Sequence, residues 1–255
     1  NESARNLHNG IYPTISANGL VRDNVSYGSE DTAMWVAASQ NVRVIGNELY
    51  DSVIGLEVNV SLNVEVKHND VHDNTVGIGL FHPNTAGNDP LPVMGNWVVE
   101  HNNVYDNNKY PHELPNPAPP GSFQGDLPPG VGILVLGVSD NVVAKNTVEN
   151  NDFVGIGVLG WCTAAESIPG RDCVSRPPIR DPSVSNNLIA QNKVSGNGTN
   201  PPPIPIAFLA ADLTYFSAGP AAGEFNSGNC FKKNKPAGYT FISSEPDGEL
   251  PTDGC

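Results

Sequence analysis

The sequence predicts an all-β protein whose short parallel strands wind into a three-sided solenoid of about 22 residues per coil. The segments SQNVRVIGN (39–47) and SLNVEVKHN (61–69) repeat one pattern at a distance of 22 residues. Related segments recur at 16–24, 94–102, 139–146, 185–192 and 227–234. Apolar residues alternate within each repeat, which is the period of a strand and not of a helix. A repeat of this length with strand patterning indicates stacked coils.

The strands of one coil can be placed on the repeat at 41–59. Its three strands are expected to begin at Asn41, Asn47 and Gly55. Because side chains alternate between the two faces of a strand, every second residue should face the core. The residues predicted to point inward are Val42, Val44, Leu49, Leu56 and Val58.

Asparagine recurs at one turn of successive coils, where backbone groups would otherwise be buried without hydrogen bonds. The residues at this turn are Asn47, Asn69, Asn102, Asn146 and Asn192. An Asn side chain carries two N–H donors and an acceptor oxygen, so it can bond both the backbone and the next Asn. We therefore predict a structural asparagine ladder.

The repeat runs nearly end to end, which predicts a single domain over 1–255. Four segments interrupt it and are expected to be loops, at 83–94, 109–129, 161–184 and 199–205. The tail 241–255 is expected to cap the last coil, because an open coil end leaves strand edges unpaired. The chain starts at Asn1 already within a repeat, so we expect upstream sequence to be missing.

The net charge and the cysteine content limit the possible partners and the cellular compartment. The net charge of −14 argues against nucleic acid as a partner, because phosphate binding needs a basic face. No run of 18 or more apolar residues is present, so no membrane span is expected. Four cysteines allow three connectivities, and we favour the local pairs Cys162–Cys173 and Cys230–Cys255. Such pairs predict a secreted protein, extracellular or periplasmic.

The segments NVRVIGNELYDSVIGLEV (41–58) and NVEVKHNDVHDNTVGIGL (63–80) resemble the repeats of right-handed parallel β-helix proteins, the pectate-lyase-like superfamily. That group includes pectate lyases, mannuronan epimerases and a periplasmic copper-delivery accessory protein. The chain most resembles secreted bacterial parallel β-helix repeat proteins of undetermined activity. The resemblance implies a right-handed coil. The Asp-Pro-His-Asp signature of alginate epimerases and the Gly-His-Gly signature of polygalacturonases are absent, so it implies no particular mechanism.

A candidate binding face follows from the four loops, which all flank the third strand of a coil. The outward residues of that strand should form a floor made of Trp35, Glu57, Gly79, Leu134 and Gly157. Glu57 and His82 are the candidate acid–base pair. The candidate sugar-contacting residues are Trp35, Gly79, Phe81, His112, Glu113 and Gly157. The alternative is that the aromatic side chains only pack beneath loops and that Glu57 is solvated.

Three further columns of like residues are predicted. Asp51, Asp73 and Asp106 share a turn and are candidate Ca²⁺ ligands, although Asp at a turn often bonds its own backbone. His68 and His101 stack on neighbouring coils and are candidate copper or zinc ligands. The aromatic column is expected to be a stabilising stack, or alternatively a sugar-binding strip; it contains Tyr27, Tyr50, His72 and Tyr105.

Together these features predict a protein that binds or processes an extracellular polysaccharide. If the protein is an enzyme, lyase, hydrolase or epimerase chemistry is expected, with Ca²⁺ as the candidate cofactor. One alternative is a non-catalytic surface scaffold that presents its loops to partners. Another is a periplasmic metal-handling accessory protein that uses His68 and His101.

Overall fold

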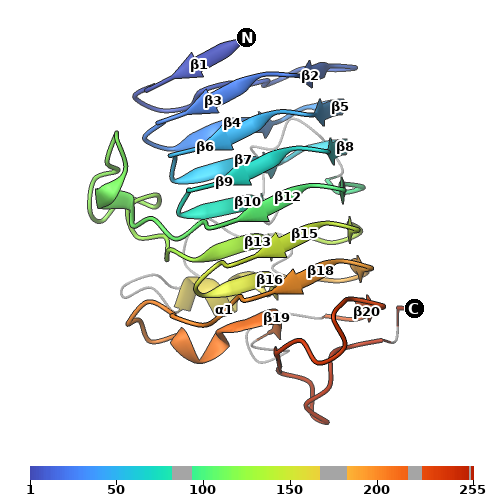
Figure 1. Cartoon of the computed structure of the whole chain (residues 1–255). Coiled ribbons are helices and arrows are strands. Elements are labelled where there is room, and N and C mark those ends of the chain that lie inside the picture. The colour runs from blue at the N-terminus through green and yellow to red at the C-terminus, as the bar shows by residue number, and fades with distance from the viewer. Residues whose placement is uncertain (82–93, 167–182, 218–225, 253) are drawn as a thin grey trace.

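In the computed structural model, three parallel β-sheets of seven strands each wrap around one core and form a three-sided solenoid (Figure 1). The structure describes residues 1–81, 94–166, 183–217, 226–252 and 254–255. Successive coils descend from the N-terminus to the C-terminus in the view of Figure 1. The all-β prediction is confirmed.

Each sheet collects one strand from each coil. The second strands form sheet A: β1 (Glu2–Ala4), β3 (Val25–Tyr27), β6 (Glu48–Tyr50), β9 (Asp70–His72), β12 (Asn103–Tyr105), β15 (Thr147–Glu149) and β18 (Lys193–Ser195). The third strands form sheet B: β4 (Thr32–Ala37), β7 (Ile54–Asn59), β10 (Val76–Phe81), β13 (Val131–Leu136), β16 (Val154–Leu159), β19 (Ala211–Phe216) and β21 (Phe241–Ser243). The first strands form sheet C: β2 (Leu20–Arg22), β5 (Gln40–Ile45), β8 (Leu62–Lys67), β11 (Val98–Glu100), β14 (Val142–Ala144), β17 (Leu188–Ala190) and β20 (Cys230–Lys232).

Helical structure among the described residues is confined to short segments between strands. They are the 3₁₀ turns η1 (Pro111–Glu113) and η2 (Ala207–Leu209) and the helix α1 (Trp161–Glu166). None of the described helices is long and apolar enough to cross a membrane.

The core follows the predicted alternation. All five residues predicted to point inward, Val42, Val44, Leu49, Leu56 and Val58, have no exposed surface. Each stacks on its equivalent in the next coil, as Val42 does on Val64 and Leu56 on Ile78. Because parallel pairing fixes this register, one apolar column repeats through the whole solenoid.

The predicted asparagine ladder lies at the corner between sheets C and A. It extends beyond the five predicted residues to Asn24 and Asn234. Asn146 shows the pattern: its Nδ2 donates to Val99 O (2.9 Å) and to Asn192 Oδ1 (3.0 Å). Its Oδ1 accepts bonds from the backbone N (3.0 Å) and Nδ2 (2.9 Å) of Asn102. Each ladder residue thus satisfies buried backbone groups and links two coils.

The other two corners carry shorter ladders that the sequence analysis did not identify. The ladder between sheets A and B contains Asn74, Asn107, Asn151 and Asn197 and ends on Asp212. The ladder between sheets B and C contains Asn141, Asn187 and Asn229. Asparagine therefore recurs at all three corners for the same structural reason.

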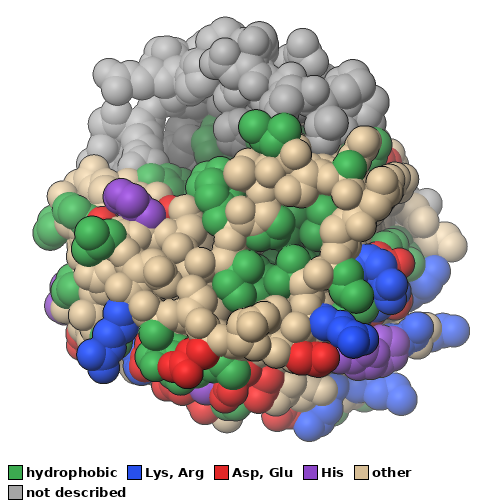
Figure 2. Space-filling model, turned by 90° about the horizontal axis from the view of Figure 1, so that it is seen from above, with side chains coloured by type: hydrophobic (Ala, Val, Ile, Leu, Met, Phe, Trp, Pro, Cys, Tyr) green, Lys and Arg blue, Asp and Glu red, His purple; other side chains and the backbone are tan. Residues whose placement is uncertain are grey.

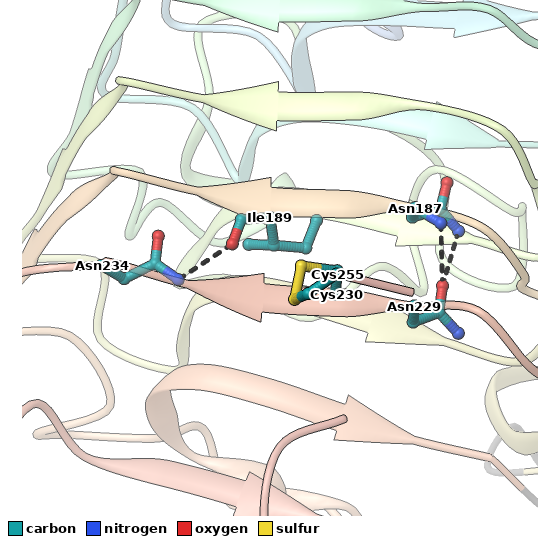
Figure 3. Close-up of a disulfide and its surroundings, with 6 residues drawn as sticks. All are labelled: Asn187, Ile189, Asn229, Cys230, Asn234 and Cys255. Atoms are coloured by element: carbon teal, nitrogen blue, oxygen red, sulfur yellow. Dashed lines mark hydrogen bonds between the residues drawn. A yellow bond between two sulfur atoms is a disulfide. The ribbon is translucent and has the colours of Figure 1, made fainter. Parts of the chain in front are cut away.

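The tail lies against the last coil. β21 pairs with β19 at the edge of sheet B, and Phe231 N in β20 donates to Pro251 O (2.9 Å). A disulfide joins Cys230 to Cys255, beside the last hydrogen bonds of two ladders (Figure 3). The predicted Cys230–Cys255 pair is confirmed. Cys162 is also disulfide-bonded, and Cys173, its expected partner, lies outside the described residues.

Removing the Cys230–Cys255 bond is expected to lower the free energy of unfolding by about 3 kcal/mol, because the bond closes a loop spanning 25 residues. The check is urea unfolding of wild type and of the double variant Cys230→Ser, Cys255→Ser, both kept under non-reducing conditions. Coincident unfolding curves would show that the tail is held without the disulfide.

Candidate functional site

The outer face of sheet B has the register that the sequence predicts. Trp35, Glu57, Gly79, Leu134 and Gly157 are successive Cα partners on β4, β7, β10, β13 and β16. The inserts at 109–129 and 199–205 both enter this sheet, before β13 and β19. The prediction that these five residues share one face is therefore confirmed, and their surroundings differ between the two halves of the face.

An aromatic pair forms the N-terminal end of this face. The rings of Tyr12 and Trp35 stack with their centres 4.5 Å apart and their planes within 12° of parallel. Tyr12 is 43% exposed, so the outer side of the pair is open to solvent. Trp35 Nε1 is buried and has no hydrogen-bond acceptor among the described residues. A sugar ring can stack on such a platform, because its C–H face is apolar while its hydroxyls remain free to hydrogen-bond.

Two carboxyl groups lie beside this pair and share one hydroxyl. Glu57 is the neighbour of Trp35 on the next strand and is 7% exposed. Thr32 Oγ1 lies 3.2 Å from Glu57 Oε2 and 3.1 Å from Asp31 Oδ1. A hydroxyl has only one proton to donate. Both contacts become hydrogen bonds when Glu57 is protonated, with Glu57 donating to Thr32 and Thr32 donating to Asp31.

The pKa values of both carboxyl groups agree with this arrangement. Burial raises the pKa of Glu57 to about 8, and the nearby Asp31 carboxylate adds to the increase. Donation from Thr32, whose single proton can go to only one of the two carboxylates at a time, and from Asn59 Nδ2 (2.9 Å) opposes the increase only in part. Burial also raises the pKa of Asp31, against hydrogen bonds from Thr32 and Gln124 and the nearby His8. At neutral pH Glu57 therefore holds a proton, as a general acid must.

The insert at 109–129 reaches across to this end of the face. Asn116 Nδ2 donates to Asn6 O (2.7 Å), and Gln124 hydrogen-bonds the Asp31 carboxylate. The insert is seen as the green excursion on the left of Figure 1. His112 and Glu113 lie in η1 of this insert and are exposed. His82, the other half of the predicted acid–base pair, lies outside the described residues.

The floor around the two glycines is filled, which differs from the open groove expected from the sequence. A Cβ added to Gly79 would lie 2.2 Å from the Phe81 ring, so that ring folds back over the glycine. Leu159 similarly covers Gly157, where an added Cβ would lie 2.9 Å from its Cδ1. The glycines make room for these apolar side chains of their own strands. They do not leave an open floor.

The C-terminal half of the face is consequently an apolar cavity of about 480 Å³. Its floor includes Leu134 and Leu159, and its walls come from both described inserts and α1. The wall residues include Phe123, Leu127, Trp161, Ile204 and Ile206. Among the described residues that line this cavity, Asp126 is the one with a carboxyl group. The Glu57–Asp31 pair lies in the N-terminal half of the face.

Two columns of side chains were predicted as metal ligands, one of aspartates and one of histidines. The described part of the structure forms both columns but does not complete either into a larger group of metal ligands. Lys109 Nζ contacts Asp51 and lies 3.7 Å from Asp73 Oδ1, so a lysine supplies the positive charge there. The rings of His68 and His101 stack 5.2 Å apart. Among the described residues, no group of three or more His, Cys, Asp or Glu side chains is placed to hold a metal ion. Calcium at Asp51, Asp73 and Asp106 and copper or zinc at His68 and His101 stay predictions.

The aromatic column on sheet A forms a continuous stack. The ring centres are 4.8 Å apart for Tyr27–Tyr50, 5.3 Å for Tyr50–His72 and 5.0 Å for His72–Tyr105. Because the ring faces lie against one another, only their edges are presented to solvent. This favours the predicted stabilising stack over the alternative of a sugar-binding strip.

Comparison with known proteins agrees with the architecture. A family model described as "Right handed beta helix region" matches residues 1–89. The chain has the fold of a right-handed parallel β-helix. No curated protein sequence matches this β-helix.

Two solved structures are similar to the β-helix at low identity. One is an alginate lyase from Paenibacillus sp. str. FPU-7, with 10% identity, a TM-score of 0.41, and coverage of 88% of this chain and 72% of the other. The other is the Dettilon tailspike protein, with 16% identity, a TM-score of 0.46, and coverage of 96% of this chain and 47% of the other. The chain thus spans about half the length of the tailspike protein.

Asp31 and Thr32 are site residues that the sequence analysis missed. Thr32 aligns with Ile54 and Val76 in the next two coils. Asp31 precedes it, in a position occupied by Val53 and Thr75 in those coils. The signal in the sequence was a carboxylate followed by a hydroxyl, at positions where the other coils carry uncharged residues. The outward residues of the strands alone do not reveal it.

Proposed function

We propose that this β-helix binds a polysaccharide at the N-terminal half of the sheet B face and cleaves it by acid–base hydrolysis. The observation that carries the proposal is a protonated Glu57 beside the Tyr12–Trp35 platform, connected through Thr32 to a second carboxyl group. The Cys230–Cys255 disulfide supports an oxidising, extracellular-type compartment.

In this proposal the two carboxyl groups have different roles. Glu57 donates its proton to the glycosidic oxygen as the bond from that oxygen to the anomeric carbon breaks. Asp31, as the carboxylate, takes a proton from the water molecule whose oxygen bonds to the anomeric carbon. One product gains the proton and the other gains the hydroxyl, so the reaction adds one water molecule. Asp31 then returns its proton through the Thr32 hydroxyl to Glu57, which restores both groups. Gln124 hydrogen-bonds the Asp31 carboxylate and Asn116 holds the same insert to Asn6, so the insert at 109–129 is expected to shift when the chain binds, with these two hydrogen bonds broken.

The test is mass spectrometry of products formed from a panel of neutral and uronate polysaccharides. Glu57→Gln and Asp31→Asn are each expected to lower the turnover rate about 100-fold or more. Trp35→Ala is expected to weaken binding about tenfold, through loss of the stacking platform. Glu48→Gln is the control, because this exposed carboxyl group lies on β6 of sheet A and not on the sheet B face. Turnover retained in Glu57→Gln would refute the assignment.

A second candidate is a non-catalytic polysaccharide-binding protein. The observation that favours it is the low exposure of the carboxyl pair: Glu57 is 7% exposed and Thr32 is fully buried. This alternative predicts that no panel member is cleaved, while Trp35→Ala still weakens binding. The same experiment therefore separates the two candidates.

A further inference from the structure

Lysine is concentrated along one edge of the β-helix. The chain has seven lysines, and only Lys109 lies elsewhere. The other six lie where sheet C turns into sheet A, and we call this the lysine edge: Lys67, Lys145, Lys193, Lys232, Lys233 and Lys235. His68 and His101 lie on the same edge. Figure 2, which looks down the coils, shows blue and purple side chains gathered at one corner on the right.

The backbone turns these side chains outward in a regular row. His68, His101, Lys145 and Lys233 occupy the same turn position of their coils, each with a positive φ between 55° and 58°. The following residue in each coil is a buried ladder asparagine, so the side chain at the turn position points away from the core. All four are exposed. Gln191 occupies the same turn position on the coil between Lys145 and Lys233, so the positive charge of the row comes from these two lysines and from the lysines that flank the turn.

Much of this positive charge is not neutralised within the protein. Lys67 and Lys145 share Glu100, at 3.8 and 3.7 Å, and Lys193 contacts Glu149 at 2.5 Å. Lys232, Lys233 and Lys235 form no ion pair with an acidic side chain in the described part of the chain. In a protein with a net charge of −14, three neighbouring lysines without an acidic partner are a local excess of positive charge that attracts anions.

We propose that the lysine edge binds an anionic linear polysaccharide, one that carries carboxylate or sulfate groups along its length. The six lysines follow one edge of the β-helix across successive coils, so a linear anionic chain can lie along them. The proposal concerns a surface separate from the sheet B face and does not rest on the function proposed there. The net charge of the whole chain predicts repulsion of anions. At the lysine edge the local charge is positive, so an anion would be attracted there.

The flanking residues disfavour nucleic acid and membrane surfaces. Acidic residues border the row on both sides, with Glu65 on sheet C and Glu48 and Asp70 on sheet A. A duplex or an anionic lipid surface is broader than the row and would meet these carboxylates. Single-stranded nucleic acid is usually held by aromatic rings on which bases stack. The turn positions of the edge carry no Phe, Tyr or Trp, and its two histidine rings face each other.

The test measures binding of polygalacturonate oligosaccharides to the whole chain by calorimetry, in buffer with a chelator. The edge variant is Lys232→Gln, Lys233→Gln, Lys235→Gln. The control, Arg5→Gln, Arg43→Gln, Lys109→Gln, removes the same charge from exposed or partly exposed positions away from the edge. The edge variant is expected to raise the Kd about tenfold or more, and the control at most about twofold. Wild-type binding should weaken as ionic strength rises from about 0.05 M to about 0.5 M.

Equal weakening in the two variants would overturn the proposal, as would absence of wild-type binding. A second variant, Lys145→Gln, Lys193→Gln, should weaken binding in the same direction if the whole row is used. Single-stranded DNA and phosphatidylserine vesicles serve as competing probes. If either binds as tightly as polygalacturonate and loses binding in the edge variant, the edge is a general anion surface and the polysaccharide assignment is wrong. Thermal unfolding of each variant establishes that the fold is retained.

Discussion

Replacing Glu57 by Gln is expected to raise the free energy of unfolding at pH 9 by on the order of 4 kcal/mol relative to wild type. The folded protein holds the Glu57 proton up to a pKa of about 8, whereas an unfolded glutamate releases it near its ordinary value of 4.5. Folding above pH 4.5 therefore requires uptake of a proton, or burial of a charge once the pH exceeds 8. The free energy of unfolding of the wild-type protein should therefore fall as pH rises from about 4.5 to about 8. Above about pH 8 the contribution of Glu57 should stay constant.

Glutamine does not titrate, and its amide can still hydrogen-bond Thr32 and Asn59. The variant should therefore lack this part of the pH dependence, so the two stability curves diverge as pH rises. The measurement is urea unfolding of both proteins between about pH 5 and about pH 9. Glu113→Gln is the control, because the exposed Glu113 should change the curve little. Parallel curves for wild type and Glu57→Gln would mean that Glu57 is ionised in the folded protein, which would also remove the general acid from the proposed mechanism.

The repeat made the solenoid and its register predictable. Once Val42 is aligned with Val64, parallel pairing fixes every other residue of the coil, because one coil is the template for the next. The column from Trp35 through Glu57 to Gly157 followed from the same alignment. The lysine edge was present in that alignment too, since Lys145 and Lys233 occupy one turn position. Here the net charge was considered only for the whole chain, and the local excess was missed.

The features that could not be predicted depend on contacts outside the repeat. Asn116 meets Asn6 across a sequence separation of 110 residues, and no periodicity fixes where an insert will lie. The ring of Phe81 lies over Gly79 because of a side-chain rotation within β10. The sequence analysis located the face and one carboxyl group on it. The insert and the partner Asp31 determine how that group ionises, and both needed the structure.

Replacing Asn146 by Ala should lower the free energy of unfolding by about 4 kcal/mol, because two buried backbone groups lose their partners. Val99 O would lose its bond from Asn146 Nδ2, and the backbone N–H of Asn102 would lose its bond to Asn146 Oδ1. Asn146 is 1% exposed, so water cannot replace these bonds without opening the corner. Asn102 Nδ2 would keep only its bond to Val66 O. Urea unfolding monitored by circular dichroism gives the difference.

The matched control is Asn103→Ala, one position beyond the ladder. Asn103 is exposed, and its Nδ2 donates only to Asp70 Oδ1 (3.1 Å), so its loss should cost less than about 1 kcal/mol. Equal effects of the two substitutions would mean that the ladder adds nothing beyond the strand pairing of β11 and β14. A large difference would show that the side-chain ladder, which the backbone cannot replace, holds consecutive coils together. A coil whose corner groups are satisfied only by the next coil is unstable alone, which explains why asparagine recurs at this position from the first coil to the last.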